Sequence, residues 1–155
     1  GKCLNINGNI TFGQYMEKGF EGHYPTLEDW KLHANLYFPE VRLRNFIEIR
    51  NHDCVDGELK YSIPALYKGI FYTTSATEEV EEILNQFTIN EIKELRYNVA
   101  KYAVDSKIGH KPILPICKEL VEIAYYALKT NGDNEEEFLL PLIEMLKKGK
   151  CPADM

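Results

Sequence analysis

The sequence lacks long apolar runs. No stretch approaches the roughly 18 consecutive apolar residues that a membrane-spanning helix needs. It also lacks a basic and then apolar leader at its N-terminus, so we expect neither export nor a membrane partner. The 155 residues, of which 45% are hydrophobic, suffice for one domain with a substantial core.

Positive charge is scarce as well. The formal net charge is −6, and a general nucleic-acid binder needs clustered Lys and Arg to neutralise phosphates. We therefore expect no nucleic-acid partner. The arginines are nevertheless concentrated, because Arg42, Arg44 and Arg50 lie close together in the sequence. They predict a local positive patch on an acidic protein.

Cysteine is sparse and widely spaced. The four cysteines form no C-x-x-C pair, which argues against a zinc site and against a dense disulfide framework. These residues are Cys3, Cys54, Cys117 and Cys151. Reduced thiols are the expectation, and with them a cytoplasmic location.

Familiar catalytic motifs are missing too. Gly109-His110-Lys111 lacks the glycines of a phosphate-binding loop. No Ser-His-Asp or Cys-His arrangement can be assigned from spacing. His33 falls in a predicted helix, where a structural role is commoner than a catalytic one. The acidic run from Asp133 to Glu137 is most simply a solvated helix start.

The periodicities predict a predominantly helical α+β chain. We expect about six or seven helices, and strands at about 3–10 and 41–50. Residues 1–60 form a strand and helix portion, and residues 61–155 a helical block. Helix starts are indicated by capping residues or by proline in a first turn. These residues are Thr11, Thr26, Thr77, Thr88 and Pro115.

The most informative stretch is 41–50, read as one strand with two different faces. Its odd positions are branched and apolar and its even positions are charged, a period of two that a helix does not explain. The apolar residues are Val41, Leu43, Ile47 and Ile49, and the charged residues are Arg42, Arg44, Glu48 and Arg50. A single strand at roughly 3.3 Å per residue would spread these charges over about 26 Å. That length could follow a triphosphate and a second small substrate.

Two interpretations of the charged face stay open. In the functional one, Glu48 binds a divalent cation, and Arg42, Arg44 and Arg50 bind phosphate or carboxylate groups, since Mg²⁺ prefers oxygen ligands and the Arg fork matches both anions. In the other, the face is simply solvated, as is common on half-buried sheets. Three cations around one anion favour function, as do the titratable residues 52–53 that follow.

These residues also carry a resemblance to a known family. Asp29-Trp30 followed by His33, Phe38-Pro39-Glu40-Val41-Arg42-Leu43, the closing Glu48-Ile49-Arg50 and the Pro64-Ala65 helix resemble glutamate-cysteine ligase of the plant and bacterial type. The match is strongest over residues 26–72. Lys150-Cys151-Pro152-Ala153-Asp154 looks like the family's segment near the C-terminus.

The resemblance implies a fold, a reaction and residue roles. The fold would be that of the glutamine synthetase superfamily, an antiparallel sheet backed by helices. The reaction would be ATP-dependent ligation of L-glutamate to L-cysteine through a γ-glutamyl phosphate. Glu48 would be the Mg²⁺ ligand and Arg50 the phosphate contact, Arg42 would hold phosphate or carboxylate, and Arg44 would contribute less. Plant members carry a redox-active cysteine near the position of Ser62, so the resemblance does not extend to their disulfide regulation.

The chain begins Gly1-Lys2 without an initiator Met, and we expect it to be the C-terminal part of a longer ligase. Its partners would then be ATP, the two amino acids and the rest of the parent chain. Without the rest of the parent chain it should be inactive. Two alternatives remain: a related ligase that uses another amine, and a non-catalytic helical interaction module.

Overall fold

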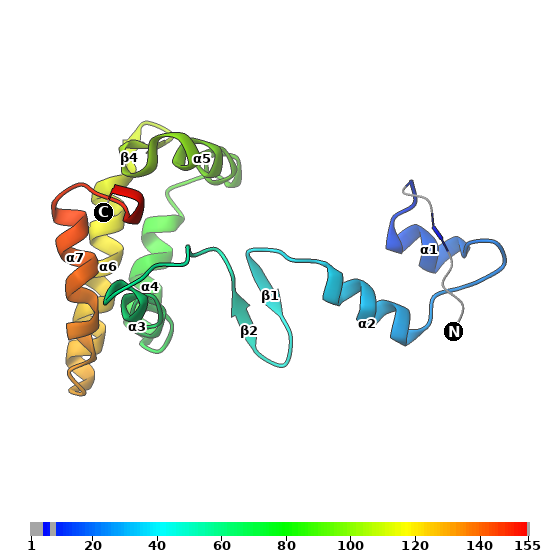
Figure 1. Cartoon of the computed structure of the whole chain (residues 1–155), viewed down its shortest axis with the longest axis horizontal. Coiled ribbons are helices and arrows are strands. Elements are labelled where there is room, and N and C mark those ends of the chain that lie inside the picture. The colour runs from blue at the N-terminus through cyan, green and yellow to red at the C-terminus, as the bar shows by residue number, and fades with distance from the viewer. Residues whose placement is uncertain (1–4, 7–8, 155) are drawn as a thin grey trace. The chain divides into compact units, whose positions relative to one another are not determined.

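The computed structural model describes residues 5–6 and 9–154 (Figure 1). Over these ranges the chain has seven α-helices and two antiparallel two-stranded sheets, which confirms the predicted helical α+β class. It divides into two compact units, the N-terminal unit Gly1–His52 and the C-terminal unit Asp53–Met155. No helix in the described ranges is long and apolar enough to cross a membrane.

The helices of the N-terminal unit, α1 (Phe12–Lys18) and α2 (Leu27–Leu36), begin at the predicted caps. The Thr26 hydroxyl accepts a hydrogen bond from the Asp29 backbone N–H at 3.3 Å, and the Asp29 carboxylate accepts one from the Thr26 backbone N–H at 2.7 Å. Such reciprocal capping satisfies donors that have no partner inside the helix. The two helices contact each other through Phe12, whose ring stacks on His33 with centroids 4.3 Å apart.

The predicted strand 41–50 is β-structure, but it is a hairpin and not one continuous strand. β1 (Val41–Leu43) pairs antiparallel with β2 (Ile47–Ile49), with Val41 opposite Ile49 and Leu43 opposite Ile47. The chain reverses through Asn45, a turn-favouring residue, and the Arg44 backbone N–H donates to the Phe46 carbonyl at 2.8 Å. The prediction of a 26 Å row of charges was therefore wrong.

The apolar side of this hairpin is exposed, contrary to the predicted dry face. Leu43 is 82% exposed and Ile47 is 68% exposed. Two strands of three residues cannot bury a face without a further layer. The predicted strand at about 3–10 is absent from residues 5–6 and 9–10, and its other positions lie outside the described residues.

The C-terminal unit is built around a helical core. It comprises α3 (Leu59–Phe71), α4 (Thr74–Leu84), α5 (Ile89–Tyr102), α6 (Ile113–Asn131) and α7 (Leu140–Lys147), with short 3-10 turns η1 (Ala103–Asp105), η2 (Glu135–Leu139) and η3 (Pro152–Asp154). The segment before α6 contains the small hairpin of β3 (Lys107–Ile108) and β4 (Lys111–Pro112). The core residues are Ala65, Ile70, Val80, Ala124, Leu128 and Leu139. Leu128 and Leu139 are fully buried, so α6 and η2 form its centre.

The helix starts here confirm some predictions and correct others. Thr88 caps α5 reciprocally with Glu91, as predicted, and Pro115 lies in the first turn of α6. α4, however, begins at Thr74 and not after Thr77. The Thr77 hydroxyl instead donates to the Ile70 carbonyl at 2.7 Å, which ties α4 to the end of α3.

Ser62 is buried and Cys117 is partly buried, as is common for residues with a structural role. Ser62 is buried within α3, and its hydroxyl donates to the Phe138 carbonyl at 2.6 Å, which joins α3 to η2. Cys54, Cys117 and Cys151 are free thiols, and burial raises the pKa of the Cys117 thiol. Cys3 lies outside the described residues. A buried thiol with a raised pKa is a poor nucleophile.

Candidate functional site

The hairpin of the N-terminal unit brings three of the four predicted site residues into one cluster. Arg42 lies directly opposite Glu48 across the strand pair, and Arg50 follows Glu48 on the same face. Arg42 Nε and Nη2 lie 2.8 and 2.7 Å from Glu48 Oε2, and Arg50 Nη1 donates to Glu48 Oε1 at 3.0 Å. Each oxygen of the Glu48 carboxylate therefore accepts hydrogen bonds from a different arginine. We call Arg42, Glu48 and Arg50 the hairpin cluster.

Arg44 is not part of the hairpin cluster. It follows β1 at the start of the turn, and its Nη2 donates to Asn35 Oδ1 at 2.8 Å. Arg42 Nη1 lies 3.4 Å from the Asn35 carbonyl oxygen in the same last turn of α2. A helix C-terminus attracts cations because its last carbonyl groups lack partners. Asn35 thus holds two arginines near each other, a role that the sequence pattern did not indicate.

Phe38 is a second residue of the site that the sequence pattern did not indicate. The guanidinium carbons of Arg42 and Arg50 lie 5.2 and 4.8 Å from its ring centroid, which is within cation–π distance. Phe38 lies in the short connection between α2 and β1, just before Pro39. The available signal was an aromatic residue close in sequence to several arginines.

The electrostatics of the hairpin cluster favour an ionised Glu48 and a net positive site. The pKa of the Glu48 carboxyl is lowered chiefly by the hydrogen bond from Arg42, and further by Arg50 and both positive charges, while burial acts in the opposite direction. Two guanidinium groups outnumber one carboxylate. Arg42 is 11% exposed and Arg50 is 35% exposed, so Arg50 is the more accessible to an anion from solvent.

The lowered pKa of Glu48 predicts a pH dependence. A carboxyl whose pKa is lower in the folded chain stabilises the fold above its unfolded pKa, and this contribution is lost as pH falls through the folded pKa. Carboxyl-carbon NMR titration of Glu48 should therefore give a higher midpoint in Arg42→Gln than in the native chain. Arg44→Gln is the matched control, since Arg44 bonds Asn35, and it should change the midpoint less. Equal midpoints in the native chain and Arg42→Gln would contradict the assigned cause.

The hairpin cluster offers a metal ion one carboxylate ligand, that of Glu48. Among residues 5–6 and 9–154, no group of three or more His, Cys, Asp or Glu side chains could hold a metal ion. Mg²⁺ is often bound through only one or two carboxylates together with substrate phosphate oxygens and water. Glu48 fits that kind of single contribution. The predicted neighbours His52 and Asp53 are divided by the boundary between the two units.

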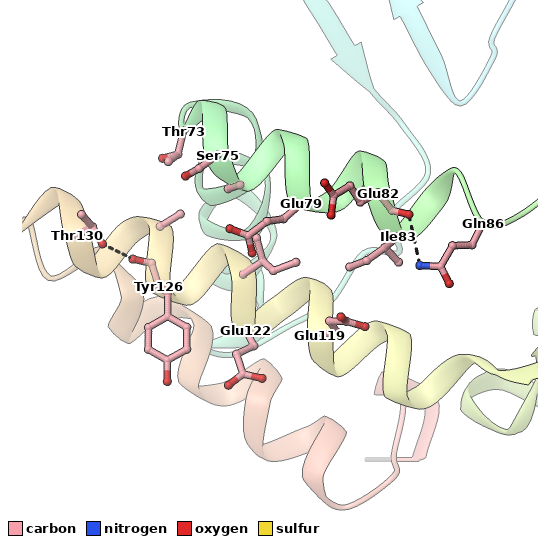
Figure 2. Close-up of a pocket in the computed structure, with 13 residues that line it drawn as sticks. Thr73, Ser75, Glu79, Glu82, Ile83, Gln86, Glu119, Glu122, Tyr126 and Thr130 are labelled. Atoms are coloured by element: carbon pink, nitrogen blue, oxygen red, sulfur yellow. Dashed lines mark hydrogen bonds between the residues drawn. The ribbon is translucent and has the colours of Figure 1, made fainter.

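A concave feature lies in the C-terminal unit between α4 and α6 (Figure 2). This cavity has a volume of about 670 Å³ and an acidic rim. Its carboxylates are Glu79, Glu82, Glu119 and Glu122. They would repel a phosphate group, so the chemistry expected of a nucleotide site favours the arginine-bearing hairpin.

Comparison with known proteins identifies the family. Residues 6–155 match the model of glutamate-cysteine ligase family 2 (GCS2), so the chain belongs to this family of ligases. It is 31% identical to the chloroplastic glutamate–cysteine ligase of Solanum lycopersicum over 86% of this chain and 25% of that protein. It is 25% identical to the corresponding protein of Arabidopsis thaliana over 99% of this chain and 30% of that protein.

These relatives bear on length and location. The chain spans between 25% and 30% of the length of the curated relatives it matches. The predicted cytoplasmic location was wrong, because those relatives are named as chloroplastic proteins, including that of Nicotiana tabacum. The prediction rested on reduced cysteines, and a reducing environment does not specify a compartment.

Proposed function

We propose that this chain is part of an ATP-dependent ligase that joins the side-chain carboxylate of L-glutamate to the amine of L-cysteine, the first step of glutathione synthesis. The observation that carries the proposal is the hairpin cluster, which pairs Glu48 with Arg42 and Arg50 in a member of glutamate-cysteine ligase family 2. An ionised carboxylate between two guanidinium groups suits phosphoryl transfer, where positioning and charge neutralisation dominate catalysis.

The reaction has two balanced steps. An oxygen of the glutamate side-chain carboxylate forms a bond to the γ-phosphorus of ATP while the bond to the ADP oxygen breaks, which gives γ-glutamyl phosphate and ADP. The amine of cysteine then attacks the acyl carbon, and phosphate leaves as the amine loses a proton. The product is an amide. Neither step needs a nucleophilic side chain of the protein.

The exposure and partners of the site residues support the following roles. Arg50, the more exposed arginine of the hairpin cluster, contacts the transferred phosphate, and Arg42 holds phosphate or substrate carboxylate. Arg44, held by Asn35, adds positive charge beside them. Glu48 would be a protein ligand of Mg²⁺, which when bound would neutralise charge on the phosphate oxygens. An anion that draws Arg50 away would leave Glu48 Oε1 available.

The remaining walls of the site belong to the rest of the parent chain. The hairpin has two short strands and contributes one carboxylate, whereas the relatives are about four times as long as the matched segment. In this proposal the hairpin joins a larger antiparallel sheet of the glutamine synthetase type, and the fragment alone is inactive. Leu43 and Ile47 are exposed in this chain, which is consistent with an apolar layer from elsewhere in the ligase covering them.

The proposal is tested with the full-length parent ligase. ADP release is measured with ATP, L-glutamate and each of a panel of amines, namely cysteine, 2-aminobutyrate, alanine and glycine. We expect cysteine to give the highest kcat/KM and turnover to require glutamate. Turnover that is indifferent to cysteine but supported by another amine would instead identify a related carboxylate–amine ligase. No ATP turnover with any amine would favour a non-catalytic module.

A further inference from the structure

Phe38 is a large apolar residue that is 62% exposed, and its neighbour Tyr37 is exposed as well. What distinguishes Phe38 is the pair of cations beside it. Two guanidinium groups lie against it, those of Arg42 and Arg50. The same two groups hold the two oxygens of Glu48. A guanidinium group donates hydrogen bonds in its own plane and leaves its faces free to stack, so both sets of contacts are compatible.

The backbone around Phe38 restricts where its ring can lie. α2 ends at Leu36, and its C-cap Tyr37 is already extended. The residue before a proline is also confined to extended conformations, and Pro39 has a fixed φ. Immediately afterwards, the Arg50 backbone N–H donates to the Glu40 carbonyl at 2.8 Å and closes the base of the hairpin. Phe38 therefore stands on a short, restricted connection beside the hairpin cluster.

We propose that Phe38 is a positioning residue that keeps Arg42 and Arg50 together when Glu48 no longer neutralises both. This inference rests on the proposed function, in which Glu48 turns to a metal ion and the arginines turn to anions. Two like charges then lose their shared partner and repel each other. The negative face of an aromatic ring attracts both cations, and it stays in contact with them when the ligands bind.

The experiment uses the full-length ligase with Phe38→Leu, which removes the ring, Phe38→Tyr, which keeps it, and Phe46→Leu as the matched control. Phe46 is also an exposed aromatic residue of the hairpin, and it lies in the turn. KM for ATP, kcat, the equilibrium Kd of ATP without glutamate and the thermal midpoint are measured. Two cation–π contacts of ordinary strength correspond to roughly a tenfold change in affinity.

We expect Phe38→Leu to raise both KM and Kd for ATP roughly tenfold, with Phe38→Tyr close to the native enzyme and Phe46→Leu unchanged. Phe38→Met, which also lacks a ring, should repeat the Phe38→Leu result. An equal loss in Phe38→Tyr, or a Kd for Phe38→Leu that matches Phe46→Leu, would overturn the inference. If that happens while turnover still requires Glu48, only the role of Phe38 fails. Turnover that does not require Glu48 refutes the proposed function itself.

Discussion

Glu48→Gln in the full-length ligase is expected to lower kcat/KM for ATP-dependent ligation by at least about a hundredfold. The substitution keeps the shape of the side chain but removes its negative charge, and with it the proposed metal ligand. It also turns one acceptor into an NH₂ group, which would face a guanidinium donor of Arg42 or Arg50. The measurement is steady-state ADP release with saturating glutamate and cysteine.

The matched control for Glu48→Gln is Glu28→Gln. Glu28 is 79% exposed on α2 and pairs with Lys31 at 2.6 Å. An exposed pair of this kind contributes about 0–1 kcal/mol, so activity should be unchanged. Glu48→Asp keeps the charge on a shorter side chain and should fall between the two. Activity of Glu48→Gln within about threefold of native, with an unchanged thermal midpoint, would remove Glu48 from the catalytic site.

Local signals explain why much of the fold could be predicted. A reciprocal capping pair such as Thr26 with Asp29 is complete within one turn, so its residues alone specify the helix start. Thr77 failed as a cap because its hydroxyl bonds the carbonyl of Ile70 on the preceding helix. That contact depends on how the chain turns between α3 and α4, and no spacing in the sequence encodes it.

The hairpin shows why the site was only partly predictable. Val41 and Leu43 face Ile49 and Ile47 across the strand pair, so the alternation of apolar and charged residues stays in phase through the turn. Alternation alone could not separate one strand from two. It did predict that Glu48 would share a face with charged neighbours. The contacts of Asn35 and Phe38 come from residues before the hairpin and depend on tertiary structure.

Gly69→Ala is expected to destabilise the C-terminal unit, although alanine is the better helix former. Gly69 lies inside α3 where that helix crosses α6. A Cβ atom added there would stand 2.6 Å from the Ala124 carbonyl oxygen and 2.8 Å from the Ala124 Cα. Both are backbone atoms, so no side-chain rotation can relieve the overlap. α3 and α6 would have to separate at the core residues Ala65 and Leu128.

Two opposing terms decide the sign of this prediction. Helix propensity favours alanine over glycine by about 1 kcal/mol, whereas overpacking a close crossing costs about 1–3 kcal/mol or more. Because the overlap at Gly69 is with rigid backbone, its cost should lie at the upper end of that range, and we expect a net loss of about 1–2 kcal/mol in the free energy of unfolding. The measurement is urea denaturation with a probe in the unit that carries the substitution. Gly13→Ala in α1 isolates the propensity term, since its added Cβ would meet only Thr11 Oγ1 at 3.8 Å. That control should be neutral or stabilising, and Gly69→Val should be worse than Gly69→Ala. If Gly69→Ala proved as stable as native, α3 and α6 would not approach each other as closely as Gly69 and Ala124 do here.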